Sequence, residues 1–298
     1  MNTNRKVYSG LEELKQHFLS FNELYDICLD GDYEPWYGMG YWDNTFIPFF
    51  IVQDNKVIAN VSLSPMVMVL QGQSHHVLQI SAVMTHPAFR GQGLSRYLMK
   101  HVMSHFSEQY EFIYLFANEE VLDFYPKFGF VRLDESSFRL KDLTDFEAMS
   151  SDWRKLSIQN REDKNLLERF AKDHRLLSKT LSFEPNSCLS TYHFILQFED
   201  SLYYSETRDC LVLMEFEEED LKIYDVFSIR PFKLEELIPT LIKTKTKEIS
   251  FFFVPDTDFG GKLEVERDPF DDDALYVYPE HKKHLFIENF VFPITSHY

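Results

Sequence analysis

The sequence predicts a mixed α/β (α+β) fold built from two consecutive halves, and three observations support this prediction. The chain has 298 residues, roughly twice the length of an ordinary domain of ~150 residues. Apolar runs typical of strands alternate with amphipathic helical patterns in both halves of the chain. The composition contains 29 Phe and only 10 Gly, which favours strands and aromatic packing over loops.

The first half begins with helical spacing and continues mainly as strands. Apolar residues recur at helical spacing over residues 11–29, and an aromatic loop with glycine and proline follows at 33–42. The strands predicted for this half are residues 45–53, 56–70, 77–85, 112–116, 128–133 and 136–140. The helices predicted between these strands are residues 93–106 and 119–125.

The second half repeats this alternation after a charged helical stretch at residues 152–181. The strands predicted here are residues 191–198, 210–216, 221–229, 249–254, 275–278 and 285–292, with a helix at 231–242. We place the domain boundary near residue 145, giving domains 1–145 and 146–298. No Pro/Gly/Ser-rich linker lies there, so we expect the two domains to pack firmly.

The order strand, strand, helix, strand occurs in both halves, which indicates a tandem duplication. In the first half the four segments are 57–70, 77–85, 93–106 and 112–116, and in the second they are 210–216, 221–229, 231–242 and 249–254. Two unrelated α+β halves remain the alternative. The second copy has Ile229-Arg230-Pro231-Phe232 where the first has a turn with two glycines.

The charge distribution indicates where an anion would bind. The net charge of −18 argues against nucleic-acid and anionic-membrane partners, because both would be repelled, and it is compatible with a cationic substrate. No Asp or Glu occurs between Asp54 and Glu108. The same window holds four cations, Lys56, Arg90, Arg96 and Lys100. A buried sheet with one helix would also be poor in acids, but it would not explain two arginines beside a glycine turn.

Cysteines and apolar runs predict a reduced, cytoplasmic protein without a metal. Cys28, Cys188 and Cys210 are too few and too scattered for a disulfide framework or a zinc site. The longest apolar runs, such as residues 251–254, are far shorter than the ~20 residues that span a bilayer. The first residues carry no apolar stretch of the kind found in secretion signals.

The segment 83–95 has the pattern of a phosphate-binding turn. A strand ends, two glycines turn the chain, and a helix begins, so several backbone N–H groups and the positive end of the helix dipole point at one spot. Gly91 and Gly93 allow close approach of the backbone, and Arg90 adds a fork of donors. The dinucleotide-binding fingerprint fails because Arg96 stands where its third glycine belongs, which makes a nucleotide-dependent oxidoreductase remote. The ATP-binding loop lacks its Gly-Lys-Ser/Thr ending.

This string resembles motif A of the GCN5-related N-acetyltransferase (GNAT) superfamily, in its Arg-Gly-x-Gly variant preceded by a strand and His-Pro. The matching residues are Arg90, Gly91, Gln92, Gly93, Leu94 and Ser95. The resemblance implies that this loop holds the pyrophosphate of acetyl-CoA. It also implies that the preceding strand, Val83, Met84 and Thr85, hydrogen-bonds the pantetheine arm.

A second segment resembles motif B of the same superfamily. Asn118 stands seven residues before Tyr125, and Lys127-Phe128-Gly129-Phe130 follows. The resemblance, which covers about residues 5–140, implies a mixed central sheet flanked by helices and then a second, GNAT-like domain without the CoA loop. It implies that Tyr125 is the general acid and that Asn118 contacts the CoA arm. A packed aromatic and a helix N-cap are the structural alternatives for these two residues.

Acetyl transfer to an amine requires a polarised thioester, a deprotonated amine and a proton for the departing thiolate. A tyrosine of pKa ~10 is close enough to a thiol of pKa ~8.5 to donate that proton. The general base stays open, because residues 56–85 contain no carboxylate. The candidates are His75 or His76, Glu119, a chain of waters, or a group from the second domain.

A terminal carboxylate at Tyr298 is one further candidate for the base. It resembles the arrangement in multi-domain aminoglycoside acetyltransferases of the enhanced-intracellular-survival type. This chain is partly similar to them in its duplicated layout and departs from them by lacking their third domain.

We therefore predict an acyl-CoA N-acyltransferase that moves an acetyl group from acetyl-CoA, as co-substrate, to a small-molecule or peptide amine. The aromatic loop at residues 36–42 lies where this family shapes the acceptor site, with ordinary core packing as its alternative. We expect the second domain to bind no CoA. A non-catalytic acyl-CoA sensor, or a partner-binding protein on the same fold, is the competing functional class.

Overall fold

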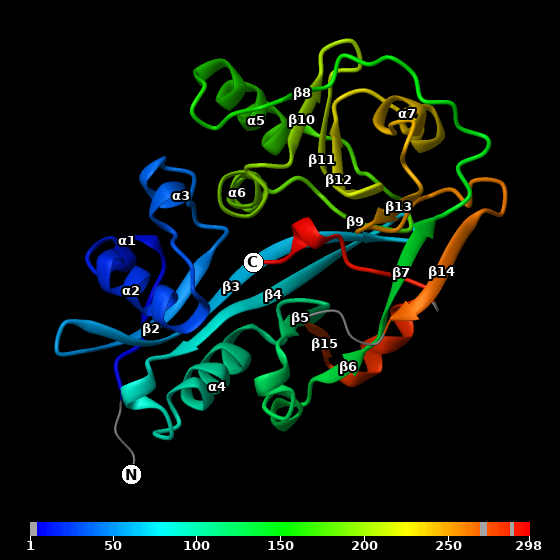
Figure 1. Ribbon diagram of the computed structural model, residues 1–298. Coiled ribbons are helices and arrows are strands. Elements are labelled where there is room, and N and C mark those ends of the chain that lie inside the picture. The colour runs from blue at the N-terminus through cyan, green and yellow to red at the C-terminus, as the bar shows by residue number, and fades with distance from the viewer. Residues whose placement is uncertain (1–4, 269–272, 287–288) are drawn as a thin grey trace.

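The computed structural model describes residues 5–268, 273–286 and 289–298, and these form two mixed β-sheets with helices packed around them (Figure 1). The predicted mixed α/β fold is confirmed. In Figure 1 the C-terminal segment lies between the sheets, next to β3 and β4.

The first sheet holds most strands of the first half in the order β1-β2-β3-β4-β5-β15-β6, with β9 paired to β3. Its strands are β1 (Tyr8–Ser9), β2 (Ile47–Gln53), β3 (Lys56–Leu70), β4 (Gln73–Thr85), β5 (Phe112–Ala117), β6 (Val131–Leu133), β9 (Leu181–Phe183) and β15 (Ala274–Tyr278). Pairing is parallel between β4 and β5 and antiparallel between the other neighbours.

Helices cover both faces of the first sheet. Helices α1 (Leu11–Lys15), α2 (Phe18–Leu29) and α3 (Glu34–Gly38) contribute apolar side chains to the core that continues into the second half. Helix α4 (Leu94–Phe106) packs against a separate core formed by the opposite face of the sheet. Because strand side chains alternate between faces, neighbouring residues of β3 and β4 enter different cores.

The second sheet has the order β14-β7-β13-β12-β11-β10-β8. Its strands are β7 (Glu135–Leu140), β8 (Arg154–Lys155), β10 (Leu202–Ser205), β11 (Cys210–Glu217), β12 (Asp220–Ser228), β13 (Glu248–Phe251) and β14 (Leu263–Asp268). Helices α5 (Arg161–Asp173), α6 (Ser187–Tyr192) and α7 (Leu234–Leu241) accompany it.

The predicted internal repeat is visible in the topology. In the first half, β3 and β4 pair antiparallel, α4 follows, and β5 pairs parallel to β4. In the second half, β11 and β12 pair antiparallel, α7 follows, and β13 pairs parallel to β12. Both halves therefore use the same strand–strand–helix–strand unit.

The two sheets exchange strands across the division expected at residue 145, since β7 joins the second sheet and both β9 and β15 join the first. Strand β7 precedes that position in sequence but pairs with β13 and β14 in the second sheet. Strand β15 comes near the end of the sequence but lies in the first sheet between β5 and β6. Each sheet is thus completed by a strand from the other half.

Three local predictions were wrong. The strand predicted at 191–198 is helical, with α6 followed by a π-helical turn, His193–Gln197. The Asn186 side chain caps this helix by accepting a hydrogen bond from Leu189 N, and burial on all sides hides the helical period.

The helix predicted at 119–125 is instead two 3₁₀ turns, η2 (Glu119–Val121) and η3 (Tyr125–Phe128). Pro126 lies in the first positions of the second turn, which suit a residue without an N–H.

The remaining error concerns residues 285–292. A 3₁₀ helix, η5, covers Glu280–Leu285, and residues 286 and 289–292 form no strand. Residues 287–288 of that prediction lie outside the described part of the chain. The charged stretch at 152–181 contains a shorter helix than expected, because α5 begins only after Asn160, whose side chain caps it.

Candidate functional site

The parallel strands β4 and β5 separate after a short paired section, and a cavity opens between them. They pair only where Val77–Gln79 faces Phe112–Tyr114. Beyond that point lies a cavity of about 500 Å³. Its lining comes from the ends of β4, β5 and α2, the turn after β5, the residue before β15, and the C-terminal segment.

The glycine turn lies at the end of β4 next to this cavity. Gly91 (φ 78°) and Gly93 (φ 74°) adopt left-handed conformations, which L side chains rarely adopt. Gly93 is the N-cap residue of α4, whose first turn contains no acidic residue. The free N–H groups and positive dipole end of this helix make the turn suitable for an anion.

Hydrogen bonds fix the geometry between this turn and β4. The hydroxyls of Thr85 and Ser95 are 2.6 Å apart, which ties the end of the strand to the first turn of α4. Arg90 Nε donates to Thr85 O at 3.3 Å, while its side chain remains exposed. The guanidinium is therefore held beside the turn with donors still available to a ligand.

A β-bulge interrupts β4 along the cavity wall. Ser81 pairs with Ser62 but Met84 pairs with Asn60, so Ala82 and Val83 oppose one residue of β3. Ala82 has a φ of 45°, and its carbonyl accepts a hydrogen bond of 2.8 Å from Asn60 Nδ2. A bulge leaves a residue out of the ladder, here at Ala82–Val83, whereas Met84 and Thr85 pair again with Asn60 and Ala59 of β3.

Tyr125 forms part of the cavity wall opposite β4. Its side chain is 5% exposed and packs against Phe124, Phe130 and Tyr276. Burial raises the pKa of the phenol well above its ordinary value, and the charge of Asp273 raises it further. The hydroxyl is therefore protonated throughout the physiological pH range.

Asn118 follows β5 and lines the same cavity. Its carbonyl accepts a hydrogen bond from Val121 N at 3.2 Å, but its side chain makes no capping bond. Asn118 is the N-cap residue of η2, as its structural alternative expects, and its exposed amide is available for a ligand. The cavity lining contains Tyr125 and six of the ten predicted cofactor residues, namely Val83, Met84, Thr85, Arg90, Ser95 and Asn118.

The histidines considered as general base lie away from this cavity. His75 Nδ1 is 2.9 Å from Glu111 Oε2 near the beginning of β4. The lining found among the described residues includes neither His75 nor His76, and it includes Glu120 in place of Glu119. It also contains Asp273 and His297, both of which sequence reasoning missed because they come from the far end of the chain.

The aromatic loop is core packing and joins the two halves. Trp36 and Trp42 are 0% and 4% exposed, and no residue of the loop lies in the described cavity lining. Trp36 Nε1 donates to Thr191 Oγ1 at 3.1 Å, and Tyr41 OH donates to Glu168 Oε1 at 2.5 Å. The expectation that this loop shapes the acceptor site is therefore wrong for its two tryptophans.

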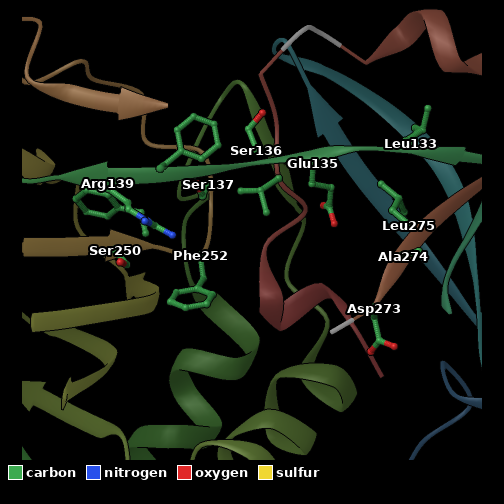
Figure 2. Close-up of a pocket in the computed structure, with 13 residues that line it drawn as sticks. Leu133, Glu135, Ser136, Ser137, Arg139, Ser250, Phe252, Asp273, Ala274 and Leu275 are labelled. Carbon is green, nitrogen blue, oxygen red and sulfur yellow. The ribbon is translucent and has the colours of Figure 1, made fainter. Parts of the chain in front are cut away.

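A second, smaller cavity of about 140 Å³ lies where β7 crosses to the second sheet. In Figure 2, Ser250 and Phe252 lie below one end of the strand, and Asp273, Ala274 and Leu275 lie below the other end. Asp273 lines both this cavity and the larger one. The strand exchange thus places the acidic residue before β15 between the two cavities.

The comparisons with known proteins agree with this geometry. The family model of the acetyltransferase (GNAT) domain matches residues 36–132, the segment that contains β4, the glycine turn and Tyr125. The chain therefore carries a GNAT acetyltransferase domain over residues 36–132. No curated protein matches the sequence.

Solved structures share the fold over nearly the whole chain. A conserved protein of unknown function from Enterococcus faecalis V583, a probable N-acyltransferase, aligns with a TM-score of 0.62 at 13% identity, covering 92% of this chain and 72% of that one. Eis1 from Mycobacterium abscessus aligns at 0.59 and 12% identity, covering 91% and 73%. A GCN5-related N-acetyltransferase from Kribbella flavida aligns at 0.55 and 14% identity, covering 92% and 71%. At these identities the likeness establishes the fold.

None of the helices in the described part of the chain has both the length and the apolar character required to cross a membrane. No group of three or more His, Cys, Asp or Glu side chains in the described ranges could hold a metal ion.

Proposed function

We propose that this protein is an acyl-CoA N-acyltransferase that transfers the acetyl group of acetyl-CoA to a primary amine. The observation that supports this most directly is the cavity between β4 and β5, which has an anion-binding turn at the end of β4 and a protonated tyrosine in its wall. The donor, the acceptor and the role of Tyr125 all belong to this proposal.

In this proposal the donor lies along β4 with its pyrophosphate at the glycine turn. The residues assigned to the pyrophosphate are Arg90, Gly91, Gln92, Gly93, Leu94 and Ser95. Val83, Met84 and Thr85 would hydrogen-bond the pantetheine arm through their backbone at the bulge, and Asn118 would contact it from the end of β5. This path runs from the N-terminus of α4 into the space between the separated strands.

The reaction needs one proton delivered and one removed. The amine nitrogen attacks the thioester carbonyl carbon, the C–S bond then breaks, and the departing thiolate takes a proton from Tyr125 OH. Because burial raises the pKa of this phenol, its proton is always present, while full transfer to a thiolate is less favourable than from an ordinary tyrosine. A hydrogen bond to the developing thiolate is therefore a large part of its contribution.

Two acidic residues, Glu120 and Asp273, line the cavity. We propose that the acceptor binds at the end of the cavity that they line. Carboxylates attract a cationic amine and can take up its proton, directly or through water. We assign the acceptor to small-molecule or peptide amines and the base to this end of the cavity, with Glu120 and Asp273 as the candidates.

We propose that the second half, residues 146–298, is a GNAT-like domain that binds no CoA, beside a first domain at residues 1–145. The segment Ile229–Phe232 replaces the glycine turn. Beyond the paired section of β12 and β13, the C-terminal segment is hydrogen-bonded to the end of β13, where Ile294 N donates to Phe252 O at 3.2 Å. A cytoplasmic location, which the scattered cysteines favour, belongs to the same proposal.

The test is calorimetric titration with acetyl-CoA, followed by an assay of thiol release with a panel of amines. Gly93→Glu is expected to abolish acetyl-CoA binding, because it strains the turn and puts an anion at the phosphate position. Gly72→Glu is the matched control, since Gly72 also has a positive φ (74°) but lies at the β3–β4 hairpin. Acetyl-CoA binding without turnover of any amine would favour a non-catalytic acyl-CoA sensor, and absence of binding would overturn the proposal.

A further inference from the structure

The cavity has a polar wall on the face of the first sheet that points away from α4. Leu78 and Ile80 of β4 pack in the core that contains α4. The residues between and after them, Gln79 and Ser81, therefore point to the opposite face. Both are buried, at 1% and 7% exposure, and both line the cavity.

The polar character of this wall continues across the sheet into β3. Gln79 pairs with Ser64 and Ser81 pairs with Ser62 in the strand register. Ser62 and Ser64 are fully buried. Four polar side chains thus occupy neighbouring positions of a face where apolar residues would be expected in a core.

Several polar atoms of this wall have no hydrogen-bond partner within the described part of the chain. They are Gln79 Oε1, Ser64 Oγ and Ser81 Oγ. Buried polar atoms are normally paired, because each unpaired one loses its hydration without compensation. Unpaired atoms at a cavity are explained when a bound molecule completes their hydrogen bonds.

The C-terminal segment adds an imidazole to the same cavity. His297 stacks on Phe116 of β5 with ring centroids 3.6 Å apart and lines the cavity. Its Nε2 atom is buried without a partner among the described residues. Burial and the neighbouring His193 hold the pKa of His297 at about 3, so the ring is neutral and one of its nitrogens accepts hydrogen bonds.

The position of His297 is fixed from both halves. Tyr114 OH on β5 donates to Ser296 O at 3.1 Å. From the second half, Asp225 accepts a hydrogen bond from Thr295 Oγ1. The second half thereby contributes to the cavity by holding the residue next to His297.

We propose that Gln79, Ser81 and His297 orient the acceptor and select an amine that carries a second hydrogen-bonding group close to the reacting nitrogen. This inference rests on the proposed function. The carboxamide oxygen takes an N–H or O–H donor, the hydroxyl takes either kind of group, and the neutral imidazole accepts. A plain alkyl amine would leave these atoms buried and unpaired, and such sites discriminate strongly against analogues that lack the polar group.

The test compares ethanolamine with propylamine, which differ by a hydroxyl in place of a methyl group. The unmodified protein is expected to prefer ethanolamine in kcat/KM by roughly 10-fold or more. Gln79→Leu is expected to bring the two amines within about 2-fold of each other. Gln73→Leu is the matched control, because Gln73 is exposed at the far end of the same strand.

Three further variants keep the test independent of the folding of Gln79→Leu. Ser81→Ala is expected to reduce the same preference. His297→Leu is expected to reduce it also, whereas His297→Gln keeps a hydrogen-bonding side chain and should restore part of it. The affinity for acetyl-CoA, measured by calorimetry, should stay within about 2-fold in all four cavity variants, since the wall acts on the acceptor.

The contrary outcomes are distinct. Equal use of both amines by the unmodified protein, or a preference that survives both Gln79→Leu and Ser81→Ala, overturns the inference. A loss of acetyl-CoA affinity in Gln79→Leu would assign the wall to the donor and also overturn it. If the protein binds acetyl-CoA but acetylates no amine, the proposed function fails and this inference fails with it.

Discussion

At the scale of single residues, burial determines the chemistry available to the site. Tyr125 keeps its proton because its phenol is removed from water and lies near Asp273. Cys28, which contacts Thr85 O through its Sγ at 3.6 Å, keeps its proton for the same reason, since burial raises its pKa. The cavity lining therefore contains two protonated donor groups, the Tyr125 hydroxyl and the Cys28 thiol.

Removing the Tyr125 hydroxyl tests its assigned role. Tyr125→Phe is expected to leave acetyl-CoA affinity unchanged and to lower kcat by roughly 10²–10⁴, the range for loss of a general acid. In the unmodified protein the rate should not fall with rising pH until above pH ~10, because the acid is lost only as pH rises through its raised pKa. Thiol release at saturating acetyl-CoA measures kcat and its dependence on pH.

Tyr97→Phe is the matched control for this prediction. Tyr97 lies on α4, and its hydroxyl donates to Arg5 O at 3.0 Å, remote from the described cavity lining. The Tyr97→Phe variant should keep the kcat of the unmodified protein. An unchanged kcat in Tyr125→Phe would remove Tyr125 from the mechanism.

A second residue-scale prediction concerns Asp225, which holds the C-terminal segment. Burial raises the pKa of this carboxyl from 3.8 to about 6, against the opposing hydrogen bonds from Thr295 and Val226 N. The folded state binds this proton more tightly than the unfolded state, so the contribution to stability is present at low pH and is lost as pH rises through about 6.

Asp225→Asn removes this titration and can still bond Thr295. The free energy of unfolding at pH 8 is expected to increase by up to about 3 kcal/mol relative to the unmodified protein, with a much smaller difference at pH 4. Urea denaturation at the two pH values measures it. A variant that is less stable at pH 8 would show that the charged carboxylate is needed to hold Thr295.

At the scale of elements, the strand exchange makes the first sheet depend on the second half. Strand β15 supplies Tyr276, which packs on Tyr125, and its hydroxyl donates to Leu122 O at 2.9 Å. Leu275 and Val277 are almost fully buried between the two halves' cores. The wall that carries Tyr125 is thus assembled from both ends of the sequence.

Weakening β15 should therefore destabilise both halves together. Leu275→Ala is expected to lower the free energy of unfolding by about 2–5 kcal/mol, as for other buried leucines, while unfolding stays a single transition. Urea denaturation followed by circular dichroism and by tryptophan fluorescence measures this. Leu176→Ala, at a position 37% exposed, is the control with little expected effect. Separate transitions for the two halves would contradict the coupling.

At the scale of the whole molecule, two buried histidines make the free energy of unfolding depend on pH. Burial lowers the pKa values of His193 and His297 from 6.5 to about 3. Both are neutral when folded, but both gain a proton when unfolded below pH ~6.5. Their contribution to stability is therefore complete above pH 6.5 and is lost as pH falls, which is opposite in sign to the effect of Asp225.

His193→Phe tests this at a residue of the second half that neighbours His297 but does not itself line the described cavity. As pH falls from 7 to 5, the free energy of unfolding of the variant should rise relative to that of the unmodified protein, by up to about 2 kcal/mol at pH 5. Thermal unfolding over this pH range measures the effect, with Tyr97→Phe as the control that should parallel the unmodified protein. A constant difference across the range would show that His193 does not titrate on unfolding.

The local sequence determined those features of this protein that depend on neighbouring residues. The two-strand, helix, strand unit was predictable in both halves because each segment shows its own apolar period. The glycine turn was predictable because Gly91 and Gly93 stand between a strand pattern and a helix pattern. Tyr125 and Asn118 could be singled out because they belong to a compact motif.

Only the tertiary structure decided which strands complete each sheet and which distant side chains reach the cavity. Strands β7 and β15 have patterns that suit either sheet, and their pairing depends on the packing of both halves. Asp273 and His297 are far from Tyr125 in sequence, so no local spacing signals their role. The helix at residues 187–197 was misread as a strand because burial on every side removes the period that distinguishes the two.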